Sequence, residues 1–125
     1  MADVVLDASA ILAVLQNEHG ADKVWEHLPG AALSAVNAAE VVAKLVDGGS
    51  AADEAGELLE RFGTRILPFE AVDIVPSARI RQGSRSLSLG DRACLALALR
   101  LAVPAITADR AWAGLQTDVK VQLIR

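Results

Sequence analysis

The sequence is poor in aromatic residues and contains a single cysteine. Aromatic side chains make up 3% of the 125 residues and tyrosine is absent, so the core is expected to be aliphatic, with no aromatic platform for stacking nucleic-acid bases. Cys94 alone excludes an internal disulfide and fits the reducing environment of the cytoplasm. It lies in the apolar segment RACLALA with no histidine close in sequence, which predicts a packed thiol instead of a nucleophile.

Long apolar runs and a basic N-terminal segment are also missing. Although 53% of the residues are hydrophobic, no run reaches the roughly 18 residues of a membrane span, so no membrane segment is expected. The N-terminal MADVVLDASA carries acidic residues where a secretory signal would carry basic ones, and no signal peptide is expected. The length predicts one domain over residues 1–125.

Positive charge is in deficit overall but is locally concentrated. The net charge of −4 argues against broad electrostatic binding of nucleic acid. The net charge also counts any carboxylates that bind a metal ion as negative, although the bound ion would neutralise them. Four arginines within one 14-residue stretch, in which the only acid is Asp91, leave room for a local anion-binding face: Arg79, Arg81, Arg85 and Arg92.

Short apolar strands alternate with amphipathic helices along the chain. Strands are predicted at residues 3–7, 31–34, 65–69, 104–107 and 119–124. Helices are predicted at 9–18, 20–28, 35–47, 51–63, 70–82 and 89–101, with a loop at 83–88. This alternation predicts an α/β fold in which a central, mainly parallel sheet of four to five short strands is flanked by helices.

Serine and proline residues suggest where these elements begin and end. Ser9, Ser34 and Ser50 each precede an apolar periodic segment and are predicted to cap the helix that follows. Pro76 is predicted to kink or restart the helix at 70–82, because proline lacks the N–H of a helical hydrogen bond. Pro68 disfavours a central position in the sheet for the strand at 65–69.

Four acidic residues stand apart because each adjoins a strongly apolar segment. Asp7 and Asp109 follow strands and should lie at the carboxyl edge of a parallel sheet. Asp91 opens the helix at 89–101, whose start faces the same edge, and Glu40 lies in the helix at 35–47, one turn after Asn37. Because clustered carboxylates repel one another unless a hard cation is bound, the pattern predicts a Mg²⁺ or Mn²⁺ site suited to phosphodiester hydrolysis.

Each of the four acids also has a purely structural explanation. Asp91 with Ser88 forms the S-x-x-D pattern of a capping box, and Glu40 could form a surface ion pair one helical turn along. Asp7 could cap a helix and Asp109 could shape a turn. For each acid taken singly, the structural explanation is as reasonable as a role as a metal ligand. It is less expected that all four acids have structural roles alone.

The motifs around these acids resemble those of the PIN-domain ribonucleases and, within that family, the VapC toxins of bacterial toxin–antitoxin pairs. The similar segments are VVLDASA at 4–10, SAVNAAEV at 34–41, LSLGDRACLALA at 87–98 and TADRAW at 107–112. Each motif is loose, but their order and spacing match over essentially the whole chain. Gly90 stands where an alanine is expected more often.

The resemblance implies a PIN-like three-layer α/β sandwich and assigns roles to seven residues. It implies that Asp7, Glu40, Asp91 and Asp109 are catalytic and bind Mg²⁺ or Mn²⁺. The resemblance also implies that the hydroxyls of Ser9 and Thr107 support these carboxylates, and that Asn37 lies beside the site.

The resemblance further implies an endoribonuclease that cleaves single-stranded or looped RNA by metal-activated water, leaving a 3′-hydroxyl and a 5′-phosphate. Such proteins form homodimers and are neutralised by a cognate, VapB-like antitoxin. DNA would be contacted only through that antitoxin, which commonly carries a DNA-binding domain. In this interpretation the metal ion attracts phosphate, and the four arginines guide the RNA backbone.

Other functional classes fit the sequence less well. A signalling receiver domain needs an acidic pair after its first strand and an Asp after its third, whereas Asp7 is single and RILPF ends without one. A phosphatase with Asp7 as nucleophile would need a second Asp at position 9, where Ser9 stands. A catalytically inactive PIN-like interaction module remains open on the sequence alone.

Overall fold

A five-stranded sheet in the order β3-β2-β1-β4-β5 organises the chain in the computed structural model, which describes residues 2–125. All four strand pairings are parallel, which confirms the predicted parallel α/β fold. The strands are β1 (Val5–Leu6), β2 (Ala32–Ser34), β3 (Arg65–Leu67), β4 (Ala105–Thr107) and β5 (Val121–Leu123).

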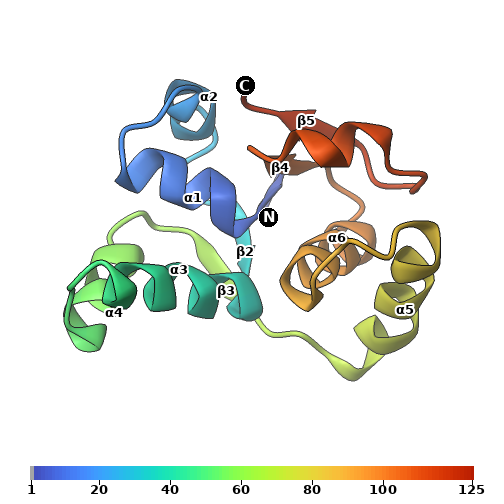
Figure 1. Ribbon diagram of the computed structural model, residues 1–125, viewed down its shortest axis with the longest axis horizontal. Helices are drawn as coiled ribbons and strands as arrows, with labels where there is room; N and C mark the ends of the chain where they lie inside the picture. Colours follow the sequence, from blue (N-terminus) through green and yellow to red (C-terminus); the bar gives the residue numbers. More distant parts are fainter. Residues whose placement is uncertain (1) are drawn as a thin grey trace.

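Helices cover both faces of the sheet and complete a three-layer arrangement (Figure 1). One face carries α1 (Ala8–Leu15), α2 (Ala21–Trp25), α3 (Ala35–Asp47) and α4 (Ala52–Glu60). The other carries α5 (Ile74–Gly83) and α6 (Leu89–Leu101). Two short 3₁₀ helices, η1 (Ala71–Asp73) and η2 (Arg110–Gly114), precede α5 and follow β4.

The side chains of successive strand residues pack alternately into two separate aliphatic cores. Leu6, Leu33 and Ile106 pack into the cluster beneath α1–α4, whereas Val5 and Ala105 pack into the cluster beneath α6. This alternation follows from the two-residue period of a strand, in which successive side chains point to opposite faces. Burial on both faces confirms the predicted three-layer sandwich.

The helix ends follow local capping chemistry. Ser34 caps α3 as predicted, because its Oγ accepts a hydrogen bond from the backbone N–H of Val36. The prediction for Ser9 is wrong: Asp7 caps α1, and Ser9 lies in the first turn of that helix. Ser50 was also expected to be a cap, but α4 starts one residue later than predicted, at Ala52. Its N-cap is Ala51, which provides no side-chain hydrogen bond.

Of the two predictions based on proline residues, the one for Pro68 is confirmed and the one for Pro76 is misplaced. The helix at 70–82 is divided at Ile74, where η1 gives way to α5, so the predicted break at Pro76 is misplaced. Pro76 lies in the first turn of α5, where the missing N–H has no helical partner to lose. The strand before Pro68 is the edge strand β3, as predicted.

The strand order places a switch point between β1 and β4. From β1 the chain adds β2 and β3 on one side, and β4 and β5 extend the sheet on the other. In open parallel sheets, ligands bind at the carboxyl ends of the strands where the order reverses, which here means beside Asp7 and Asp109. The order also differs from the 2-1-3-4-5 order of receiver-type domains, which excludes that alternative.

Among residues 2–125, no helix has both the length and the apolar composition needed to cross a bilayer.

Candidate functional site

Asp7 lies at the switch point and accepts hydrogen bonds from three different residues. It follows β1, caps α1 and is 4% exposed. Its Oδ1 accepts hydrogen bonds from the Ser9 hydroxyl at 2.7 Å and from the Ala10 backbone N–H at 2.9 Å. Its Oδ2 accepts one from the Thr107 hydroxyl at 2.6 Å. The carboxylate is therefore fixed between the ends of β1 and β4.

The two hydroxyl groups connect this carboxylate to the loop after β4. Each directs its hydrogen at Asp7, which leaves the oxygen free to accept from a backbone N–H. The Ser9 Oγ accepts from Ala108 at 2.9 Å, and the Thr107 Oγ1 accepts from Asp109 at 3.0 Å. The hydrogen bond expected from Ser9 to a neighbouring carboxylate is thus present, and α1, β1 and β4 form one connected network.

Burial controls the acidity of Asp7. Loss of solvent raises the pKa of its carboxyl group from 3.8 to about 6, against the opposing effect of the Thr107, Ser9 and Ala10 hydrogen bonds. The nearby charge of Asp91 raises the pKa further. A carboxylate whose ionised form is disfavoured in this way gains stability from a cation, so the position suits a metal ligand.

Glu40 and Asn37 connect α3 to the start of α6. Asn37 is buried, and its Nδ2 donates to the Glu40 Oε1 at 2.8 Å and to the Gly90 carbonyl oxygen at 3.0 Å. Glu40 itself is exposed and is bonded to Asn37 instead of forming the surface ion pair considered from the sequence. Within residues 2–125 the Oδ1 of Asn37 is a buried acceptor without a hydrogen-bond partner.

Asp91 and Asp109 both have local capping roles. The Asp91 Oδ2 accepts from the Ser88 N–H at 3.0 Å, and the Ser88 Oγ accepts from the Asp91 N–H at 3.1 Å, which is the predicted capping box. Asp109 is exposed and caps η2 by accepting from the Ala111 N–H at 3.0 Å. The structural explanations for Asp7, Asp91 and Asp109 are therefore correct, and they do not preclude a second role.

Three of the four acids lie within electrostatic range of one buried thiol. Burial raises the pKa of Cys94 well above its usual value, and the charges of Asp7, Asp91 and Glu40 raise it further. Cys94 lies on α6 one turn after Asp91 and is fully buried, as predicted. The carboxylates of Asp7 after β1, of Glu40 in α3 and of Asp91 in α6 thus all raise the pKa of one residue of α6.

The carboxylates are of the chemical type that binds a hard divalent cation, although their side chains are not arranged as a set of metal ligands. In the described chain, residues 2–125, no three acidic, histidine or cysteine side chains form a group that would hold a metal ion. Glu40, Asp91 and Asp109 are each occupied by a local hydrogen bond. The all-oxygen donor set and the unpartnered Oδ1 of Asn37 nevertheless match the preference of Mg²⁺ and Mn²⁺.

The four arginines lie on α5, on α6 and in the loop between these helices. Arg81 and Arg85 are exposed at the end of α5 and in the loop that leads to α6. Arg92 lies in the first turn of α6, where its Nε donates to the Ser88 carbonyl at 3.3 Å. Arg79 instead borders a hollow that also contains Leu99, about 12 Å along α6 from Asp91.

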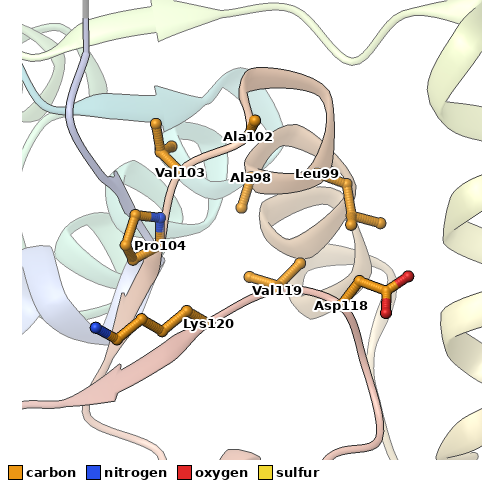
Figure 2. Close-up of a pocket in the computed structure, with 8 residues that line it drawn as sticks. All are labelled: Ala98, Leu99, Ala102, Val103, Pro104, Asp118, Val119 and Lys120. Carbon is orange, nitrogen blue, oxygen red and sulfur yellow. The ribbon is translucent and has the colours of Figure 1, made fainter.

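A second hollow, of about 400 Å³, lies away from the acids at the amino ends of β4 and β5 (Figure 2). Figure 2 shows the charged groups of Asp118 and Lys120 pointing away from each other, which leaves a mostly apolar interior. Its lining comprises Ala98, Leu99, Ala102, Val103, Pro104, Asp118, Val119 and Lys120. With one carboxylate at its rim, it lacks the groups that a divalent cation requires.

The PIN domain family model matches residues 4–116. A toxin–antitoxin complex from Klebsiella pneumoniae has a similar fold, with a TM-score of 0.76, 18% identity and 98% of both chains covered. VapBC2 from Rickettsia felis, bound to a DNA fragment from its promoter, gives a TM-score of 0.73 at 11% identity, covering 96% of this chain and 97% of that one.

VapC20 from Mycobacterium tuberculosis, described as a toxin that cleaves the sarcin–ricin loop, gives a TM-score of 0.71 at 19% identity, covering 94% of this chain and 98% of that one. None of the curated proteins matches the sequence. At these identities the solved structures establish a shared fold.

Proposed function

The chain belongs to the PIN domain family, and we propose that it is a VapC-type toxin, a metal-dependent endoribonuclease that cleaves single-stranded or looped RNA. The observation that carries the proposal is the buried carboxylate of Asp7, which hydrogen bonds from Ser9 and Thr107 fix at the switch point of the sheet. The similarity in fold to a toxin that cleaves the sarcin–ricin loop supports the choice of RNA as substrate.

The metal site proposed here comprises Asp7, Glu40, Asp91 and Asp109. A bound Mg²⁺ or Mn²⁺ would lower the pKa of a water molecule and stabilise the developing charge on a phosphoryl oxygen. Because Asp109 is exposed and Asp91 is half-buried, their side chains can turn toward an ion without disturbing the core. Asp7 is already in place, since α1 and β4 hold both of its oxygens.

The supporting residues act by restricting the carboxylates. Ser9 and Thr107 donate hydrogen bonds that favour the ionised form of Asp7, and Asn37 restricts the rotation of Glu40. Such fixed carboxylates need little reorganisation when charge develops during hydrolysis. Attack of water on phosphorus with departure of the 3′ oxygen leaves a 3′-hydroxyl and a 5′-phosphate.

Arg81 and Arg85 are proposed to contact the RNA backbone. Replacing both with alanine is expected to weaken RNA binding and to flatten its salt dependence, by a slope of about 0.7 for each phosphate that is no longer neutralised. Fluorescence anisotropy with single-stranded RNA over a range of salt concentrations measures both quantities. The double variant Arg61→Ala/Arg65→Ala removes the same charge from the residue after α4 and from β3, and it serves as the control. Equal affinities for the two variants would contradict this role.

The proposal includes protein partners and a cellular location. A VapB-like antitoxin would neutralise the enzyme and would provide any contact with DNA, as the complexes of similar fold suggest. Exposed apolar side chains at Val72, Ile74 and Val75 offer the kind of surface that a partner chain covers, which supports a homodimer or an antitoxin contact. The single reduced cysteine supports a location in the cytoplasm.

An RNA cleavage assay tests this function. End-labelled single-stranded RNA incubated with the purified protein should be cut in the presence of Mn²⁺ or Mg²⁺ and should stay intact with EDTA. The fragments should carry a 3′-hydroxyl and a 5′-phosphate, which enzymatic end-labelling identifies. A folded protein that binds an antitoxin but leaves RNA uncut with either metal would support the inactive interaction module instead.

A further inference from the structure

Gly90 lies directly beneath the carboxylate of Glu40. It is the second residue of α6, immediately before Asp91, and it is buried. A Cβ atom added at position 90 would clash with both carboxylate oxygens and with the Cδ of Glu40. The glutamate head group therefore occupies the volume that any other residue at this position would fill with its own side chain.

Asn37 holds the glutamate in that place. Its side-chain amide bridges the Glu40 Oε1 and the Gly90 carbonyl oxygen, at 2.8 Å and 3.0 Å. Asn37 is 1% exposed, so the bridge is shielded from water although Glu40 itself is exposed. The Glu40 carboxylate packs into the space left by the missing side chain of Gly90. The Asn37 amide, bound to the Gly90 carbonyl, keeps that carboxylate against the first turn of α6.

The backbone gives no reason for glycine at this position. Gly90 is helical and is not among the glycines with positive φ, which are Gly20, Gly30, Gly49 and Gly63. Glycine within a helix is less stable than alanine, because it loses more conformational freedom on folding. The reason for glycine at this position is therefore the space next to its Cα, which the methyl group of an alanine would fill.

We propose that Gly90 is a positioning residue for Glu40, and that the metal affinity of the site depends on it although it provides no ligand atom. The inference rests on the function proposed above. The missing side chain keeps the Glu40 carboxylate next to Asp91, the following residue, so that both acids are available to one ion. The effect is expected to act through Glu40, because the three atoms nearest to an added Cβ all belong to that side chain.

Gly90→Ala is a selective way to disturb this arrangement. The atoms that must move are at the far end of a flexible, exposed side chain, so the backbone of α3 and α6 can stay in place. Gly56→Ala is the matched control, because Gly56 lies within α4 and has no atom within 4 Å of an added Cβ. Both substitutions make the same chemical change within a helix, and one of them displaces a carboxylate.

The test is calorimetric titration of Mn²⁺ into wild type, Gly90→Ala, Gly56→Ala, Glu40→Gln and the double variant Gly90→Ala/Glu40→Gln. The dissociation constant is expected to rise about tenfold in Gly90→Ala, a typical effect of losing a residue that orients a ligand, and to stay unchanged in Gly56→Ala. In the Glu40→Gln background, Gly90→Ala is expected to have no further effect. The metal-free melting temperature of Gly90→Ala should be no lower than that of wild type.

Two results would overturn the positioning role while leaving the proposed function intact. One is wild-type Mn²⁺ affinity in Gly90→Ala, together with weakened binding in Glu40→Gln. The other is an equal loss from Gly90→Ala whether or not Glu40 is present, which would mean that the methyl group acts on another part of the site. Absence of Mn²⁺ binding in the wild-type protein would overturn both the inference and the proposed function.

Discussion

Asp7→Asn is expected to abolish RNA cleavage and to leave the metal-free protein at least as stable as wild type. The loss reflects removal of a metal ligand worth several kcal/mol of transition-state stabilisation, or about 10³-fold or more in rate. The fold should tolerate the change because the amide has the same shape and can still hydrogen-bond to Ser9, Ala10 and Thr107, with the Thr107 hydroxyl accepting from it instead of donating.

The pKa of Asp7 predicts how stability depends on pH in the absence of metal. Because the folded-state pKa is about 6 and the unfolded value is 3.8, the folded protein binds more protons between these two pH values. The contribution of Asp7 to stability therefore falls as pH rises from about 4 to about 6, by about 3 kcal/mol in all, and then stays constant. Asp7→Asn lacks this contribution.

Urea denaturation of both proteins in EDTA at several pH values measures the effect. The difference between the two curves isolates Asp7 from the other acids, and Asp7→Asn should become the more stable protein as pH rises through about 6. Parallel pH curves would contradict the raised pKa. A folded variant that still cleaves RNA at the wild-type rate would exclude Asp7 from the metal site.

Asp91→Asn tests whether Asp91 has a role beyond its capping box. The amide oxygen of an asparagine can still accept from the Ser88 N–H, so the helix cap should survive while one negative charge is lost. RNA cleavage is expected to fall by a factor similar to that of Asp7→Asn, with little change in melting temperature.

Ser88→Ala is the matched control, because it removes the other half of the capping box and keeps the carboxylate. It is expected to lower stability by about 1 kcal/mol without changing the cleavage rate of the folded protein. Melting curves and single-turnover cleavage rates for the two variants separate these roles. If Asp91→Asn cleaves at the wild-type rate, capping is the whole role of Asp91.

The sequence predicts the layered fold well where apolar periodicity and capping signals agree. The helix at 89–101 is observed with the predicted bounds, because Ser88 and Asp91 define its start and an apolar run fills its interior. Where two polar residues compete to cap one helix, the sequence is ambiguous. Asp7 precedes Ser9 by two residues and takes the cap of α1, since its carboxylate reaches the N–H of Ala10.

Contacts between residues distant in sequence could not be predicted in this way. Asp73 is 2% exposed and is paired with Arg100, 27 residues later, through hydrogen bonds of 3.1 and 3.2 Å. Nothing in the local pattern distinguishes it from the solvated acids of α4. The same holds for Gly90, whose contact with Glu40 joins two helices that are adjacent only after the sheet has formed.

Calorimetric titration of Mn²⁺ into the metal-free wild-type protein and into Asp7→Asn tests the proposed metal site most directly. If the carboxylates at the switch point bind a divalent ion, the wild-type protein should show saturable binding that Asp7→Asn loses. Binding near pH 6 should also release protons, because Asp7 is then partly protonated in the metal-free protein. Absence of binding to the wild-type protein, or equal affinity in Asp7→Asn, would contradict a metal site built on Asp7.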